Sequence, residues 1–272
     1  MPDIFDFWAE CPPNARVHPQ DAPVFARAGN MGFDLECLPS NVWGTLKTAR
    51  LVLLFLSPGF DPFDLEYAKR PSSHEIMARR RQGIEPLNSK DDHPGGWKWW
   101  TSRTKAFGTP EELGDKVAIL NIGAYHSKTF EDAHALMAIS SSRVAIGWAQ
   151  SILFPQAERG ERVVVCLRKP RAWGLTRGVT YPGTLYAPHV NAAGYMVKGP
   201  VRKAIITAAR KALGLPHNQA LVDASYHPSE RFMWSDMSQI RPLNPDLTPM
   251  SAEQVAEIAR YHASKGGDDK PG

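Results

Sequence analysis

Three polar side chains of the 272-residue chain stand where apolar, strand-like runs end. Asp61 follows the apolar run 51–56, and Asn121 and His189 come at or just after the ends of two later runs. A carboxylate can orient a water molecule, an amide offers an acceptor and two donors, and an imidazole can donate a hydrogen bond. A parallel sheet gathers the carboxyl ends of its strands at one edge, where α/β proteins bind ligands. These side chains, far apart in sequence, could therefore meet in one pocket.

Four apolar runs predict the strands of such a sheet: 51–56, 116–121, 162–167 and 183–186. Short runs that are apolar throughout are typical of parallel strands covered on both faces. Helical patterns alternate with them, at 71–82, 129–148 and 201–213. The alternation predicts an α/β fold, a three-layer α/β/α sandwich around a short parallel sheet of four strands.

Composition divides the chain into three parts: an irregular N-terminal lead-in at 1–40, the α/β domain at 41–215, and a C-terminal extension at 216–272. Within the domain we expect a short helix at 41–48 and a long insertion loop at 86–110, and long loops are often functional. The extension is expected to hold one short helix, at 251–264, and a disordered tail.

The overall composition is that of a globular protein, 43% hydrophobic and 22% charged, with a net charge of +4 that is compatible with nucleic acid. Cys11, Cys37 and Cys166 form no CxxC pair, which argues against a zinc site, an iron–sulfur cluster or a disulfide scaffold. The N-terminus lacks a basic region, and no apolar stretch approaches about eighteen residues. We therefore expect a cytoplasmic protein with no membrane partner.

The strand ends carry motifs in a particular order. Segment 59–64 reads Gly-Phe-Asp-Pro-Phe-Asp, segment 118–121 reads Ala-Ile-Leu-Asn, and segment 187–189 reads Ala-Pro-His. Together they resemble the uracil-DNA glycosylase superfamily, whose motifs are Gly-Gln-Asp-Pro-Tyr-His, Leu-Leu-Leu-Asn and Ala-Pro-His-Pro-Ser-Pro-Leu. Segment 56–59, Leu-Ser-Pro-Gly, also matches the Ile-Asn-Pro-Gly of a second branch. The resemblance covers roughly residues 39–213 and implies that family's fold.

The resemblance implies catalytic roles for three residues. Asp61 would orient the attacking water and face the positive charge that develops on the sugar. In the second register Ser57 would hold that water. His189 would donate a hydrogen bond to the base oxygen that gains negative charge. Each also has a plain structural interpretation, as a turn residue, a strand-end cap and a surface histidine.

The base itself would be bound by four residues. Asn121 suits the polar edge of a pyrimidine, although a strand-end Asn can also cap its own turn. Phe63 would form the pocket wall, with Phe60 beside it in place of the family's Gln, and Tyr125 lies in a polar segment that could line the pocket floor. The tryptophans of the insertion either stack on bases or pack the loop onto the core: Trp97, Trp99 and Trp100.

Basic residues near the last two strand ends are candidates to contact the DNA backbone: Arg168, Lys169, Arg171 and Lys198. The leucine that the family inserts into the duplex falls at Ala193, which is too small for a wedge. Tyr195 or Met196 could replace it, or the substrate could be single-stranded.

The combined prediction is a monofunctional, monomeric DNA glycosylase without metal or cofactor. It would flip a uracil-like or modified pyrimidine out of single- or double-stranded DNA and hydrolyse its glycosidic bond, leaving an abasic site. A modified base would suit antiviral defence against bacteriophage DNA. One alternative is a metal-dependent nucleotide or phosphoester hydrolase that uses Asp61, Asp64 and His126. The other is a nucleic-acid-binding module on the same fold without chemistry.

Overall fold

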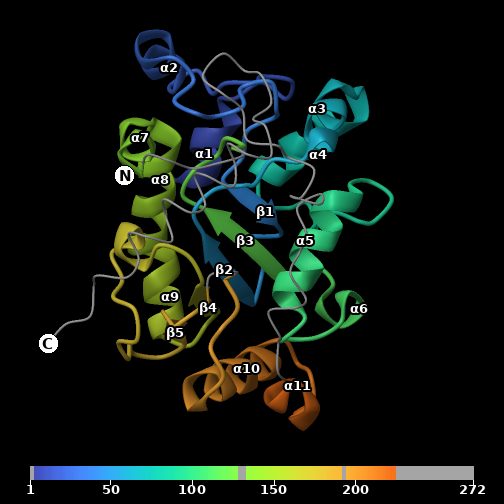
Figure 1. The fold of residues 1–272 in the computed structure, drawn as a ribbon, viewed down its shortest axis with the longest axis vertical. Coiled ribbons are helices and arrows are strands. Elements are labelled where there is room, and N and C mark those ends of the chain that lie inside the picture. The colour runs from blue at the N-terminus through green and yellow to red at the C-terminus, as the bar shows by residue number, and fades with distance from the viewer. Residues whose placement is uncertain (1–2, 128–132, 192–193, 225–272) are drawn as a thin grey trace, which may run out of the picture. The chain divides into compact units, whose positions relative to one another are not determined.

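Five strands form one mixed sheet in the part of the chain that the structure describes, in the order β1-β3-β2-β4-β5 (Figure 1). The computed structural model describes residues 3–127, 133–191 and 194–224, all within one of the chain's two units, Met1–Tyr226. The strands are β1 (Val42–Gly44), β2 (Leu51–Phe55), β3 (Val117–Asn121), β4 (Val163–Cys166) and β5 (Leu185–Tyr186).

Four of the strands are parallel, as the apolar runs predict. Leu54 of β2 pairs with Leu120 of β3 on one side and with Cys166 of β4 on the other. Strand β5 continues the parallel order beside β4. The general α/β class and the four parallel strands are therefore confirmed.

The sheet has a fifth strand that the sequence did not predict, and this strand lies in the segment 41–48 where a helix was expected. Strand β1 pairs antiparallel with β3, so that Val42 faces Leu120 and Trp43 faces Ile119. Gly44 ends it with φ +86°, and a Cβ there would lie 2.5 Å from the Val117 carbonyl oxygen. Only glycine fits so close an approach to the neighbouring strand.

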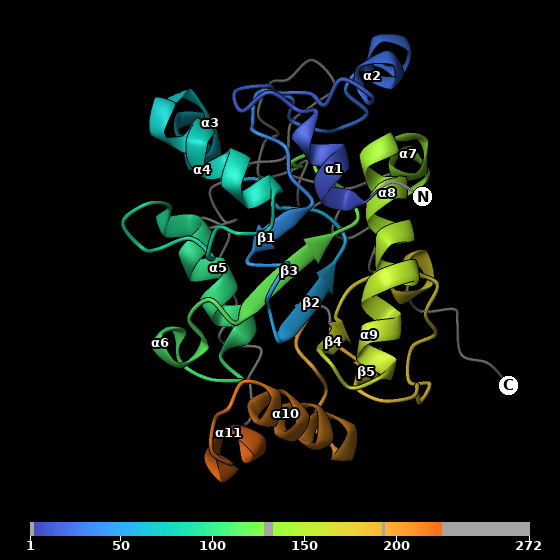
Figure 2. The same ribbon diagram turned by 180° about the vertical axis from the view of Figure 1, so that it is seen from behind.

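Both faces of the sheet are covered. Val52 and Leu54 point into one core, whereas Leu51, Leu53 and Phe55 point into another. The helices α8 and α9 lie along the first face and α5 along the second (Figures 1 and 2). Strand β2 is buried on both sides, and its sequence is therefore apolar without alternation.

The helices follow the predicted alternation, with α4 and α10 near the expected ranges and a break between α7 and α8 at Ile139. Their bounds are α1 (Ile4–Ala9), α2 (Ala22–Ala28), α3 (Pro62–Lys69), α4 (Pro71–Arg81), α5 (Pro94–Thr104), α6 (Pro110–Leu113), α7 (Ala133–Ala138), α8 (Ser140–Trp148), α9 (Phe154–Glu158), α10 (Pro200–Ala212) and α11 (Gln219–Asp223). A π-helical turn (Ala149–Leu153) joins α8 to α9, and a 3₁₀ turn (Pro170–Trp173) follows β4.

The N-terminal segment is not an irregular lead-in. Helices α1 and α2 lie within it, and Ile4, Phe7 and Trp8 of α1 are buried in the core of the first sheet face. Asp3 caps α1 by accepting a hydrogen bond from the Phe5 N–H. The prediction failed because frequent Pro and Asp mark helix starts here as well as loops.

The expected insertion loop is also largely helical. Helix α5 occupies its centre, capped by His93, whose Nδ1 accepts a hydrogen bond from the Gly96 N–H. Trp100 is buried and donates from its indole to the Asn88 carbonyl oxygen. Two glycines in the first turn weaken the helical pattern in the sequence, and packing of the tryptophans compensates for them.

Helix α11 lies in the C-terminal extension, where the sequence predicted a helix only at 251–264. The helix expected at 251–264 lies outside the described residues. No helix in the described ranges has the length and apolar character that a membrane crossing requires.

Candidate active site at the carboxyl edge of the sheet

The order of the parallel strands creates a switch point between β2 and β4. From β2 the chain moves outward to β3, and from β4 it moves the opposite way to β5. In open α/β sheets a crevice forms at such a point, outside the carboxyl ends of the strands. Every strand-end residue that the sequence singled out follows one of these ends: Ser57 and Asp61, Asn121, Arg168, and His189.

Asp61 begins α3 as its N-cap. Its Oδ1 accepts a 2.8 Å hydrogen bond from the Phe63 N–H, which is the structural role expected of an Asp-Pro turn. Its Oδ2 faces the start of α5, where a Cβ on Gly95 would lie 2.9 Å away. The half-buried carboxylate therefore keeps one oxygen beside the N-terminus of a second helix.

Asp64 is the centre of a buried polar cluster. Its Oδ1 accepts from Nε2 of His93 at 2.7 Å, and its Oδ2 lies 3.1 Å from Nδ1 of His126. Oδ2 also accepts from the Asp61 N–H at 2.7 Å, which completes a capping box at α3. Nδ1 of His126 donates in addition to the Gly59 carbonyl oxygen at 2.7 Å. These bonds fix the loop after β2 to the segment after β3.

The charges in this cluster support one another. Burial alone would raise the pKa of the Asp64 carboxyl, but His126 and His93 hold it below its usual value. Burial would lower the pKa of His126, whereas Asp64 and the Gly59 carbonyl raise it above its usual value. Asp64 and His126 are therefore a buried ion pair. The sequence suggested roles for Asp64 and His126 only in the alternative hydrolase. It did not indicate that these two side chains pair with each other.

Asn121 carries an unpartnered polar atom. The side chain is 2% exposed, and its Oδ1 has no hydrogen-bond partner among the described residues. Asn121 pairs with Phe55 of β2 and follows Ile119 by two positions, so it lies on the α5 face of the sheet. A buried acceptor without a partner costs about 1–3 kcal/mol, so this position favours a ligand or a trapped water over a structural cap.

A group that we call the arginine–tyrosine cluster lies beside the ends of β4 and β5; it comprises Arg103, Lys105, Arg168 and Tyr195. The Arg103 guanidinium lies 4.8 Å from the centre of the Tyr195 ring, and the Lys105 ammonium 5.6 Å from it. A Cβ on Gly194 would lie 3.1 Å from Nε of Arg168, so this arginine packs against the turn that carries Tyr195.

Electrostatics confirm that the arginines of this cluster are neighbours. Burial lowers the pKa of Arg103, Tyr195 acts in the opposite direction, and nearby Arg168 lowers it further. Burial likewise lowers the pKa of Arg168, and Arg177 adds to this effect. Like charges held together are typical of a site for an anion. The sequence did not single out Arg103 and Lys105 because they lie within the segment 86–110 that was predicted to be a loop.

The other predicted backbone contacts lie on the surface nearby. Lys169, Arg171 and Lys198 are exposed. Lys169 has φ +48°, a left-handed conformation that a non-glycine residue rarely adopts. Residues held in such conformations cluster at functional sites.

His189 and Ser57 also lie at this edge. His189 is exposed, and its ring lies against Gly178, where a Cβ would come within 2.7 Å of Nε2. Ser57 is half-buried and lies next to Gly123, just beyond β3.

Two of the predicted base-binding residues have structural contacts instead. Tyr125 is buried in the other core, where its hydroxyl donates to Oδ2 of Asp21 at 2.7 Å and accepts from the His18 N–H. Burial raises the pKa of this phenol, and it anchors the N-terminal segment rather than a ligand. Phe63 packs beside a small cluster of Leu38, Tyr67, Ala68 and Met77, and Arg70 lies over its ring. Phe60 is buried.

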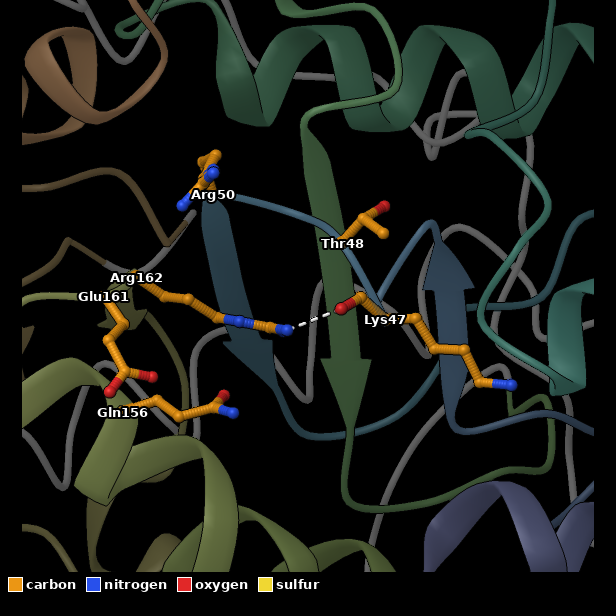
Figure 3. Close-up of a pocket in the computed structure, with 6 residues that line it drawn as sticks. All are labelled: Lys47, Thr48, Arg50, Gln156, Glu161 and Arg162. Carbon is orange, nitrogen blue, oxygen red and sulfur yellow. Dashed lines mark hydrogen bonds between the residues drawn. The ribbon is translucent and has the colours of Figure 1, made fainter.

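A hollow of about 360 Å³ lies at the opposite edge of the sheet (Figure 3). Arg50 and Arg162 line it, and they directly precede β2 and β4. Two nitrogens of the Arg162 guanidinium donate to the carbonyl oxygens of Leu46 and Lys47. This arginine therefore joins the strand to a neighbouring turn, and the hollow is separate from the candidate site.

Among the described residues, no three His, Cys, Asp or Glu side chains are arranged to hold a metal ion. Compared with protein-family models, with curated proteins and with solved structures, the chain matches none of them. The function must therefore be argued from the geometry of the site.

Proposed function

We propose that the protein is a DNA glycosylase that removes a pyrimidine base from DNA at the carboxyl edge of its sheet. The observation that carries the proposal is the buried, unpartnered Oδ1 of Asn121. It lies at the same sheet edge as a carboxylate and a cluster of arginines. These are the parts that glycosidic hydrolysis of a nucleic acid requires: recognition of the base, activation of water and binding of phosphate.

Asp61 is the proposed water-orienting carboxylate. Its Oδ1 is committed to the α3 cap, which fixes the rotamer of the side chain. Its Oδ2 is then held in one position, where it can accept a proton from water and stabilise positive charge on the sugar. The bond from the Asp61 N–H to Asp64 adds to this rigidity. A catalytic group that is already held in its reactive position lowers the entropic cost of reaching the transition state.

The arginine–tyrosine cluster is the proposed contact for the DNA backbone. Arginine forks match phosphate geometry, and the Tyr195 ring, close to two cations, is an aromatic surface on which a base could stack. Lys169, Arg171 and Lys198 would extend this contact along the strand. Tyr195 is the residue that we propose to fill the gap left by the extruded base.

An assay for abasic sites tests the proposal. The protein would be incubated, with chelator present, on single- and double-stranded oligonucleotides that carry uracil, and on modified and unmodified phage DNA. Alkali then cleaves the DNA at abasic sites. We expect alkali-dependent breaks on at least one of these DNAs. Breaks that appear without alkali and vanish in chelator would instead favour the metal-dependent hydrolase. Tight DNA binding without breaks would favour a binding module.

A further inference from the structure

Three polar atoms without a described hydrogen bond lie on the β1–β3 side of the candidate site. Besides Oδ1 of Asn121, Nε1 of Trp43 is buried and has no partner within the described ranges. His126 is 4% exposed, and the hydrogen bonds described for it use only Nδ1, which leaves Nε2 unused. We call these three residues the Trp–Asn–His site.

Strand register brings the three side chains together. Trp43 pairs with Ile119 across β1 and β3, so Asn121 is its diagonal neighbour on the same face of the sheet. The Trp43 ring also meets the His126 ring edge-to-face, with 6.1 Å between their centres. Trp43 therefore adjoins both of the other residues.

Neighbouring groups fix the positions of the two donors, Trp43 and His126. The Arg80 guanidinium lies 4.3 Å from the centre of the Trp43 ring and covers it. His126 is fixed by its Nδ1 bonds to the Gly59 carbonyl oxygen and to Asp64. Burial would lower the pKa of His126, but Asp64 and Asp34 raise it above its usual value, which favours the imidazolium, the form that can donate from Nε2.

We propose that Trp43 and His126 act with Asn121 to recognise the polar edge of the extruded base. The indole N–H and the imidazolium Nε2–H donate to acceptors on the base, and Oδ1 of Asn121 accepts from an N–H of the base. The inference rests on the proposed function and adds two residues that the sequence analysis did not assign to the base. A donor from His126 also stabilises the negative charge that the base acquires as its glycosidic bond breaks.

The number of donors and acceptors limits which base fits. Two donors and one acceptor complement uracil or cytosine, each of which presents two acceptors and one donor on its pairing edge. Guanine presents one acceptor and two donors, and would leave buried groups unpaired. A site with buried polar groups rejects a mismatched ligand strongly for that reason.

Binding of free uracil and free cytosine to the intact protein tests the inference without relying on catalysis. Trp43→Phe removes the indole N–H and keeps an aromatic ring under Arg80. We expect roughly tenfold weaker binding of the preferred base, the loss of about one hydrogen bond. Asn121→Leu is a second variant of similar size that removes the acceptor oxygen, and we expect it to weaken binding by at least as much.

Trp173→Phe is the matched control. Its indole nitrogen is also buried without a described partner, but the side chain lies in the core on the opposite face of the sheet. We expect Trp173→Phe to bind like the wild type. Unfolding of each variant by urea shows whether it is folded under the conditions of the binding measurement.

The outcomes separate this inference from the proposed function. Base binding that is weakened in Trp43→Phe and Asn121→Leu, without any release of base from DNA, supports the recognition site and rules out the glycosylase. Base release at the wild-type rate in Trp43→Phe overturns the recognition site and leaves the glycosylase standing. A wild-type protein that binds neither base overturns the recognition site and implies that trapped waters satisfy these atoms.

Discussion

Nε2 of His93 donates a 2.7 Å hydrogen bond to Oδ1 of Asp64, and this bond ties the start of α5 to the start of α3. Nδ1 of the same ring accepts from the Gly96 N–H, so His93 caps α5 with one nitrogen and holds Asp64 with the other. Asp64 therefore contacts a different histidine with each oxygen, His93 at Oδ1 and His126 at Oδ2. The carboxylate thereby fixes the loop that carries Asp61.

Asp64→Asn should destabilise the protein by about 3–5 kcal/mol, the usual cost of breaking a buried ion pair. Asp64 has a lowered pKa, so its contribution is present above about pH 4 and is lost as the pH falls through the folded-state value. His126 has a raised pKa, so its contribution is present below about pH 6.5 and is lost as the pH rises through the folded-state value. Asp34 also favours charged His126.

Urea unfolding across the pH range measures this effect. The difference between wild type and Asp64→Asn should be largest between about pH 4 and 6.5 and should shrink on both sides. Asp92→Asn, an exposed carboxylate that bonds only Ser89 in the described contacts, is the control. A pH-independent difference would mean that the pair is not ionised.

Tyr125→Phe should reduce the free energy of unfolding by about 1–3 kcal/mol and leave base binding unchanged. The substitution leaves Oδ2 of Asp21 and the His18 N–H without the phenol that joins them. Tyr181→Phe, whose hydroxyl accepts from an exposed backbone N–H, should cost less. Weaker base binding in a stable Tyr125→Phe protein would instead show that Tyr125 contributes to base binding, as the sequence suggested.

Arg168→Gln and Arg103→Gln should each weaken DNA binding whatever the base sequence of the DNA. Each should also reduce the slope of log Kd against log salt concentration by about one, because one phosphate contact is lost. Arg159→Gln, an exposed arginine paired with Glu161, should leave that slope unchanged. Fluorescence anisotropy with a labelled oligonucleotide at several salt concentrations gives the slopes. Equal slopes in all four proteins would show that the cluster does not contact the backbone.

His126→Gln should slow base release at least tenfold more than His189→Ala does. Both histidines lie at the site edge, but His126 is buried and fixed by two hydrogen bonds, whereas His189 is exposed to competing water. Single-turnover rates at pH 6.5 measure the difference. A larger loss of rate in His189→Ala would instead indicate that His189 donates to the base, as the family resemblance implies.

The parallel part of the fold could be predicted because buried parallel strands leave a continuous apolar pattern. Strand β1 left no such pattern: it has three residues, and its stability comes from pairing with β3, 70 or more residues later. Helix α5 was missed because Gly95 and Gly96 in its first turn suggest a loop. Tertiary packing of Trp100 outweighs that local preference.

The candidate site could be predicted only as far as topology determines it. Asp61 and Asn121 reach the same edge because their strands are parallel neighbours. The bond between His93 and Asp64 joins side chains 29 positions apart and depends on where α5 packs. Trp43 could not be placed at the site while its segment was taken for a helix.

The most direct measurement of the central claim is mass spectrometry of the free base released from DNA by the wild type and by Asp61→Asn. The account predicts that the wild type releases a pyrimidine in the same amount as the abasic sites that it forms. Asp61→Asn, folded and able to bind DNA, should be slower by roughly 10²–10⁴-fold. Release of no base from any of these DNAs, or equal rates for the two proteins, would contradict it.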